Sequence, residues 1–174
     1  MRPRSEGGFV KLILCPKCGK DFVRRTLRKG AHEFLLSVLY VYPYRCQLCA
    51  HRFLWLELGK RYNESAIDKR QYERVETTFP ATFVGEKASG AGTVTRLSLG
   101  GCALESPLKL MEGMMFNLRL QPPGINPAIN VETAIVRSVR PPIVGLEFLR
   151  IHSNEQFRLI QFVAGLLTAH RKVE

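Results

Sequence analysis

Four of the five cysteines in this chain occur as two identically spaced pairs, with two residues between the thiols of each pair. The pairs are Cys15 with Cys18 and Cys46 with Cys49. This spacing lets both sulfurs of a tight turn point at one tetrahedral Zn²⁺ ion, about 2.3 Å from each sulfur. Because thiolates fill all four positions, the pattern predicts a structural zinc site rather than a catalytic one with an open position.

The residues around the cysteines favour a zinc ribbon, with a long hairpin or a short helix joining its two turns. Gly19 after the first pair suits a sharp turn, whereas Ala50 takes that place after the second pair. A redox role for one pair is the alternative. His51 is interpreted as a surface histidine, because four thiolates already complete the site.

The positive charge is concentrated in the first part of the chain. Residues 1–75 hold 16 basic and 7 acidic side chains, whereas residues 76–174 hold 10 and 8. Such an excess favours anionic partners. Between the cysteine pairs, a cationic cluster adjoins an apolar and aromatic run, and it consists of Arg24, Arg25, Arg28 and Lys29. Nucleic-acid binding is one interpretation, and a solvated basic edge of the ribbon is the favoured one.

The sequence predicts two domains. Residues 58–68 carry turn formers and charges without apolar periodicity, so they are interpreted as a linker between a zinc-ribbon-like module at 1–57 and a domain at 69–174. In that domain, six short apolar or alternating runs, separated by Gly, Pro and Asn, predict an antiparallel barrel or sandwich. The fold class is therefore mainly β.

A closing helix is predicted from Ser153 onward. Ser153 and Gln156 form a capping-box pattern. Helical spacing then places an apolar face toward the core, made of Phe157, Ile160, Ala164 and Leu167.

Neither a membrane anchor nor a catalytic centre is predicted. The most apolar early stretch, residues 33–44, has about half of the ~20 residues that span a bilayer. The N-terminus shows no secretion signal, so a cytoplasmic location is expected. No nucleophile, base and orienting group occur together: the four histidines are scattered, and Cys102 is interpreted as a buried small apolar residue.

Three features together resemble the PilZ domain over about residues 66–174. Arg70-x-x-x-Arg74 precedes the first strand, Ser98-x-x-Gly101 follows with a second apolar strand after it, and VGLEFLRIHSNEQFRLI passes from strand to helix. Proteins of this family are bacterial receptors for cyclic di-GMP and are built on a six-stranded antiparallel barrel. The resemblance therefore implies that ligand and that barrel.

The resemblance also implies roles for individual residues. Arg70 and Arg74 would clamp the ligand, because a guanidinium forks onto guanine or phosphate oxygens, and Lys69 would be a phosphate partner. Ser98 would hydrogen-bond the ligand, and Gly101 would keep the surface bare for a base. From composition alone, residues 98–101 would be a tight connection or bulge that uses the tolerance of glycine for positive φ.

Arg96 departs from the family pattern, which has Asp or Asn at this position. Asp or Asn would accept hydrogen bonds from guanine N1 and N2, whereas Arg has no acceptor. Loss of that partner would cost ~1–3 kcal/mol, or roughly ten- to a hundredfold in affinity. Arg96 could compensate by contacting a phosphate or by stacking on a base.

The leading hypothesis is a cyclic di-GMP receptor in which the ligand draws residues 58–75 onto the barrel and reorients the ribbon toward a downstream protein partner. One alternative is a degenerate PilZ module that binds a protein and no nucleotide. Another is a nucleic-acid binder led by the basic ribbon, with steeply salt-dependent affinity.

Overall fold

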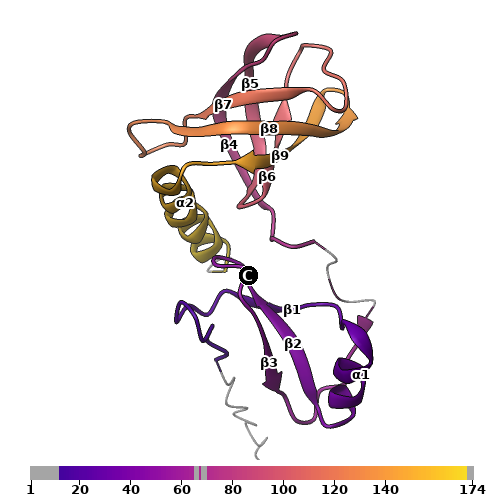
Figure 1. Cartoon of the computed structure of the whole chain (residues 1–174). Helices are drawn as coiled ribbons and strands as arrows, with labels where there is room; N and C mark the ends of the chain where they lie inside the picture. The colour runs from indigo at the N-terminus through magenta and orange to yellow at the C-terminus, as the bar shows by residue number, and fades with distance from the viewer. Residues whose placement is uncertain (1–11, 65–66, 68–69, 172–174) are drawn as a thin grey trace, which may run out of the picture. The chain divides into compact units, whose positions relative to one another are not determined.

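The structure, a computed structural model, describes residues 12–64, 67 and 70–171, and the chain divides into two compact units at residues 1–69 and 70–174 (Figure 1). The division falls at the C-terminal end of the predicted linker 58–68. Lys69, a predicted phosphate partner, lies outside the described residues. Among the described residues, no helix is both long and apolar enough to cross a membrane.

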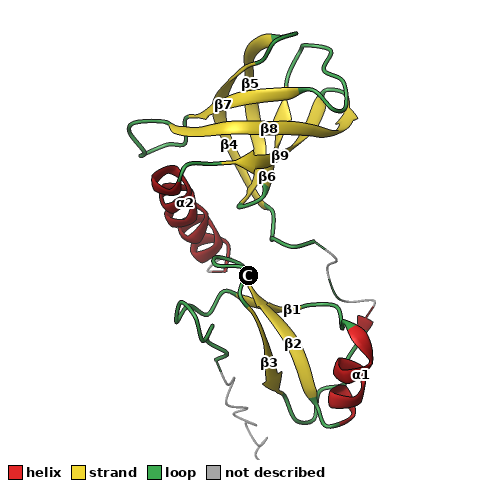
Figure 2. Ribbon diagram, viewed as in Figure 1, coloured by secondary structure: helices red, strands yellow, loops and turns green. Residues whose placement is uncertain are grey.

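The first unit is a small antiparallel sheet with one short helix (Figures 1 and 2). Its elements are β1 (Val23–Arg25), α1 (Gly30–Val38), β2 (Val41–Cys46) and β3 (Arg52–Leu56). The central strand β2 is the best protected, with Tyr42, Tyr44 and Cys46 buried. The segment between the cysteine pairs therefore contains both a hairpin strand and a helix.

The second unit is a closed six-stranded antiparallel barrel with strand order β4-β5-β6-β9-β8-β7 (Figure 2). Its strands are β4 (Val75–Val84), β5 (Ser89–Ser98), β6 (Gly101–Glu105), β7 (Met115–Leu120), β8 (Ile129–Arg140) and β9 (Ile143–Arg150). Each predicted apolar run lies in one of these strands. The prediction of a mainly β chain with a six-stranded barrel and a closing helix is confirmed.

Alternation of side chains along the strands builds the barrel core. In β7, Phe116, Leu118 and Leu120 are buried while the residues between them are exposed. Such a period of two places alternate side chains on opposite faces of a strand. The outward-facing residues of neighbouring strands can therefore form a surface site without disturbing the core.

The C-terminal helix α2 (Ser153–Arg171) packs against the barrel with a different face from the predicted one. Leu159, Val163 and Leu167 are the buried residues, whereas Phe157 is 61% exposed. The rings of Phe162 and Phe79 meet edge to face with their centroids 5.8 Å apart. Of the predicted residues, Leu167 is buried, Ile160 and Ala164 are half-buried and Phe157 is exposed, so the buried face is rotated from the predicted one.

The predicted capping box is also wrong. The amide of Gln156 donates to the carbonyl of His152 at 2.8 Å, so the helix begins one residue earlier than the pattern requires. Nearby, Arg158 donates to the backbone carbonyl of Ala128 at 3.1 Å and pairs with Glu155. These polar contacts fix which stripe of the helix faces the barrel.

Candidate functional site

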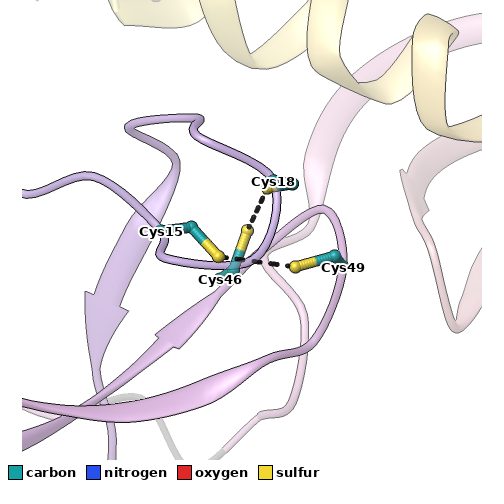
Figure 3. Close-up of side chains that lie close together, drawn as sticks. All are labelled: Cys15, Cys18, Cys46 and Cys49. Carbon is teal, nitrogen blue, oxygen red and sulfur yellow. Dashed lines mark hydrogen bonds between the residues drawn. The ribbon is translucent and has the colours of Figure 1, made fainter.

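The four paired cysteines of the first unit meet at one point (Figure 3). All four Sγ atoms lie within 4.8 Å of one another. The Sγ atoms of Cys15 and Cys49 are 3.5 Å apart, and those of Cys18 and Cys46 are 3.6 Å apart. A tetrahedron with metal–sulfur bonds of about 2.3 Å has edges of about 3.8 Å, so this donor set fits a four-thiolate metal ion.

The two cysteine turns share one backbone geometry. In each turn, the amide that follows the second cysteine donates to the carbonyl of the first, at 2.8 Å and 3.1 Å. The amide of the first cysteine donates to the carbonyl five residues ahead, at 2.8 Å and 2.9 Å. Gly19 and Ala50 both adopt positive φ, 68° and 57°. Ala50 therefore makes the turn that Gly19 makes, at the cost of a left-handed conformation that disfavours a β-carbon.

The surroundings shift the pKa values of the Cys15 and Cys46 thiols in opposite directions. Burial would raise the pKa of Cys15, but hydrogen bonds from the amides of Cys18 and Lys17 and from neighbouring thiols lower it to about 7. Burial raises the pKa of Cys46 to about 12, although the amides of Cys49 and Leu48 oppose that rise. Amides that point at a sulfur stabilise a thiolate, as a metal-binding cysteine requires.

Two of the four clustered cations of the ribbon are tied into the first unit. The Arg25 Nη2 atom lies 2.5 Å from Glu57 Oε2, and its guanidinium sits over the ring of Tyr42 at 4.6 Å. Arg28 lies between the rings of Phe34 and Tyr62, at 3.9 Å and 4.1 Å from their centroids. These contacts support packing within the ribbon, so a nucleic acid would have to compete for both side chains.

Part of the predicted linker packs onto the ribbon. The Tyr62 hydroxyl accepts from the Arg28 amide and donates to the Thr26 carbonyl, each at 3.1 Å. The Lys60 Nζ atom lies 2.9 Å from Glu57 Oε1. Residues 60–62 therefore belong structurally with the first unit.

The second unit carries an open cleft of about 670 Å³ on the outside of the barrel. Its walls come from residues 70–74, the β5–β6 turn, β8, β9 and the start of α2. Its charged lining residues are Arg70, Arg74, Arg137, Arg150 and Glu147. Four guanidinium groups against one carboxylate make this surface suited to an anion.

The cleft gathers four of the residues that the resemblance implied. Arg70, Arg74, Ser98 and Gly101 all line it. Arg96 does not occur among its described lining residues: it lies on β5 directly after a bulge and opposite Glu76 on β4. The ligand roles assigned to all five residues stay predictions.

Ser98 and Gly101 form the last cross-strand pair of the β5–β6 hairpin. The Ser98 hydroxyl, on a residue only 5% exposed, donates to the Gly101 carbonyl at 3.0 Å. A β-carbon at Gly101 would overlap the carbonyl oxygen of Leu146. The hairpin thus needs a glycine at this position because another strand approaches it closely.

Residues 98–101 form the predicted tight connection between β5 and β6, but positive φ explains neither of its glycines, so only that part of the expectation is wrong. Gly100 and Gly101 both lie outside the positive-φ region. A β-carbon at Gly100 would lie 2.9 Å from the ring of Tyr72. Tyr72 therefore packs against the bare backbone of the turn, which holds the segment with Arg70 and Arg74 beside the cleft.

Several lining residues were missed by sequence reasoning. Tyr72, Arg137, Glu147 and Arg150 line the cleft, but no ligand role was predicted for them, although Tyr72 lies between the two motif arginines and Glu147 and Arg150 lie in the VGLEFLR segment of the resemblance. The alternation of β9 marks Glu147 as outward-facing, but only strand pairing places it beside Gly101. No local signal in the sequence could have found it.

Cys102 is buried inside the barrel and lies apart from the four-cysteine cluster, as predicted. Burial raises the pKa of its thiol to about 12, and the nearby positive charge of Arg74 opposes the rise only weakly. At neutral pH this thiol stays protonated and is a poor nucleophile.

Comparison with protein families matches residues 68–165 to the PilZ domain. No curated protein matches the chain. Among solved structures, the PilZ domain of CeSA from a cellulose-synthesising bacterium is 20% identical (TM-score 0.44; 54% of this chain and 97% of that chain covered). The Bacillus subtilis inhibitor of motility, MotI/DgrA, is 21% identical, with a TM-score of 0.49. The match covers 70% of this chain and 65% of that chain. An uncharacterised Legionella protein is 16% identical (TM-score 0.38; 58% and 99%).

Proposed function

Because the chain belongs to the PilZ domain family, a family known for binding cyclic di-GMP, we propose that its barrel binds cyclic di-GMP in the arginine-lined cleft. The observation that supports this proposal is that four arginines line one open cleft of about 670 Å³. Ligand sites commonly measure about 300–1,000 Å³. The proposed role is that of a receptor and involves no catalysis.

The arginine segment before β4 supplies the first contacts. Arg70 and Arg74 are exposed residues that line the cleft, and a guanidinium group can fork onto phosphate or guanine oxygens. Tyr72 lies between them in sequence and packs on Gly100. This contact keeps both arginines at the cleft, which lowers the entropic cost of ordering them when the ligand binds.

The barrel wall supplies the remaining contacts. Arg137 and Arg150 line the cleft from β8 and β9, where they can neutralise the second phosphate of a cyclic dinucleotide. The Ser98 hydroxyl already donates a hydrogen bond to the Gly101 carbonyl. It can therefore serve the ligand only as an acceptor, through its remaining lone pair.

For the first unit, we propose a structural Zn²⁺ held by Cys15, Cys18, Cys46 and Cys49. The Sγ separations support this assignment, and four thiolates leave no coordination position for a substrate. The ribbon would then be a rigid surface for a downstream protein partner. Ligand binding at Arg70 and Arg74 would reorient the ribbon through the short connection that ends at residue 69.

One observation favours a second candidate function, a PilZ module that binds a protein but no nucleotide. Arg96 replaces the acceptor of the family pattern and lies outside the described lining of the cleft. Under this alternative, Arg70→Ala would leave function intact, and the same partner would be bound with or without nucleotide.

Titration calorimetry of the intact, zinc-loaded protein with cyclic di-GMP tests the proposal. Wild type should release or absorb measurable heat and bind one saturable site. Arg70→Ala should weaken binding roughly ten- to a hundredfold, because hydrogen bonds to a charged group contribute about 1.5–3 kcal/mol. Arg119→Ala, an exposed arginine on β7 that does not line the cleft, is the matched control. Absence of heat at high micromolar ligand would reject the proposal.

A further inference from the structure

A row of cross-strand partners crosses the floor of the cleft. Ser98 on β5 pairs with Gly101 on β6, and Gly101 pairs with Glu147 on β9. The next row along these strands, Leu97, Cys102 and Leu146, is buried in the core. Since adjacent rows face opposite sides of a sheet, Ser98, Gly101 and Glu147 lie on the outer side of the barrel wall, where Ser98 is only 5% exposed and Glu147 is 49% exposed.

Gly101 leaves the middle of this row without a side chain. Neighbouring strands lie about 4.8 Å apart, so about 10 Å separates Ser98 from Glu147, and the space between them holds only backbone, including the Leu146 carbonyl that lies where a β-carbon of Gly101 would be. A planar base can lie on such a surface with a polar side chain at each end. The geometry favours a flat heterocycle at Gly101 whose edges meet Ser98 and Glu147.

Glu147 is the only carboxylate among the described residues that line the cleft. Its side chain is 49% exposed, and its Oε2 atom lies 2.5 Å from the Nε atom of Arg137, which is 58% exposed. Exposed ion pairs of this kind contribute little to stability. Glu147 can therefore exchange Arg137 for a ligand group, and Arg137 can turn to a phosphate.

Guanine presents two adjacent N–H donors, N1 and N2, on one edge. A carboxylate accepts both in a bidentate contact, whereas arginine offers only donors. Position 96 holds Arg, so the contact must come from elsewhere in the cleft. We propose that Glu147 is the specificity-determining acceptor that reads this guanine edge, an inference that rests on the proposed cyclic di-GMP function.

The assignment explains how the cleft would select guanine over adenine. Adenine offers a ring acceptor where guanine offers the N1 donor, so it meets the carboxylate of Glu147 with a lone pair. Two acceptors that face each other without a donor between them cost binding affinity. Glu147 should therefore set the ratio of affinities for cyclic di-GMP and cyclic di-AMP.

The test measures both dinucleotides by calorimetry on the intact protein and on Glu147→Gln. The glutamine amide keeps the size of the side chain but turns one acceptor into a donor. Cyclic di-GMP affinity should fall roughly ten- to a hundredfold, whereas cyclic di-AMP affinity should rise, because the glutamine amide can donate to adenine N1. Glu105→Gln is the matched control, because Glu105 is an exposed residue of β6 that does not line the cleft.

A rescue variant makes the test specific. Combining Arg96→Asn with Glu147→Gln restores an acceptor at the family position and should recover part of the lost affinity and selectivity. Equal melting temperatures of all variants would exclude unfolding as the cause. If wild type binds cyclic di-GMP and Glu147→Gln keeps its affinity and selectivity, the inference is overturned while the proposed function stands. If wild type binds neither dinucleotide, both are overturned.

Discussion

The cysteine cluster and the arginine cleft differ in the sign of their charged groups and in how far those groups are exposed to solvent. Cys15 and Cys46 are 1% and 0% exposed, and their negative charge would be balanced by an ion inside the fold. The cleft instead exposes four arginines beside one carboxylate. A module with buried thiolates folds only when its metal ion is bound, whereas exposed cations remain solvated without a ligand. The first site thus suits a permanent metal, and the second suits a messenger that binds and leaves.

The largest effect is expected from breaking the metal site. Cys46→Ser should abolish zinc binding and unfold the ribbon, because structural zinc contributes about 10–16 kcal/mol of apparent free energy in small zinc-finger peptides. The barrel is a separate compact unit and should keep its own melting transition. Metal analysis and calorimetric melting measure both effects.

His51→Gln is the control for that variant. His51 stacks near Phe53, with ring centroids 6.1 Å apart, and lies outside the group of four possible ligands. It should therefore retain about one zinc per chain. Retention of zinc by Cys46→Ser, or its loss from His51→Gln, would contradict the four-thiolate assignment.

The two sites differ in how far sequence could predict them. Each cysteine turn is local, so its spacing alone indicated the cluster, and the short apolar runs indicated the barrel strands. Arg137, Glu147 and Arg150 reach the cleft only through pairing of distant strands, as with Glu147 opposite Gly101. Without strand registers these residues could not be distinguished from other charged surface positions.

The helix face shows a second limit. The stripe through Phe157 and the stripe through Leu159 are both apolar, so periodicity alone could not choose between them. The choice depends on Arg158, which bonds to the backbone before β8, and on the edge-to-face contact of Phe162 with Phe79. Both are tertiary contacts.

A smaller effect should separate charge from geometry in the cleft. Arg74→Lys keeps the positive charge but loses the planar fork that suits phosphate and guanine. Cyclic di-GMP affinity should fall by roughly tenfold in calorimetry, about 1.4 kcal/mol. Arg119→Lys on β7 should leave the affinity unchanged. An unchanged affinity in Arg74→Lys would show that Arg74 acts only through its charge.

Arg96→Asn should change affinity less, and in the opposite direction. It adds an acceptor at the family position, so cyclic di-GMP should bind more tightly, by up to about tenfold, since Glu147 already supplies one acceptor. Calorimetry at constant salt measures the change. Weaker binding would show that Arg96 itself contacts the ligand.

The smallest effect tests the equivalence of the two cysteine turns. Gly19→Ala should destabilise the zinc-loaded ribbon by about 1 kcal/mol, because a left-handed conformation disfavours a β-carbon, and no atom lies within 4 Å to confound the effect. Ala50→Gly should stabilise it by about 0.5–1 kcal/mol for the same reason. Chemical denaturation measures both, and changes of equal sign would reject the equivalence.

The most direct test of the central claim follows backbone glycine amides by NMR while the intact, zinc-loaded protein is titrated with cyclic di-GMP. Gly100, Gly101 and Gly145 line the cleft, whereas Gly124 lies in a barrel loop away from it and Gly19 lies in a cysteine turn. The three cleft amides should shift and saturate together while that of Gly124 stays in place. No shift at high micromolar ligand, or shifts confined to the ribbon glycines, would contradict a cyclic di-GMP site on the barrel.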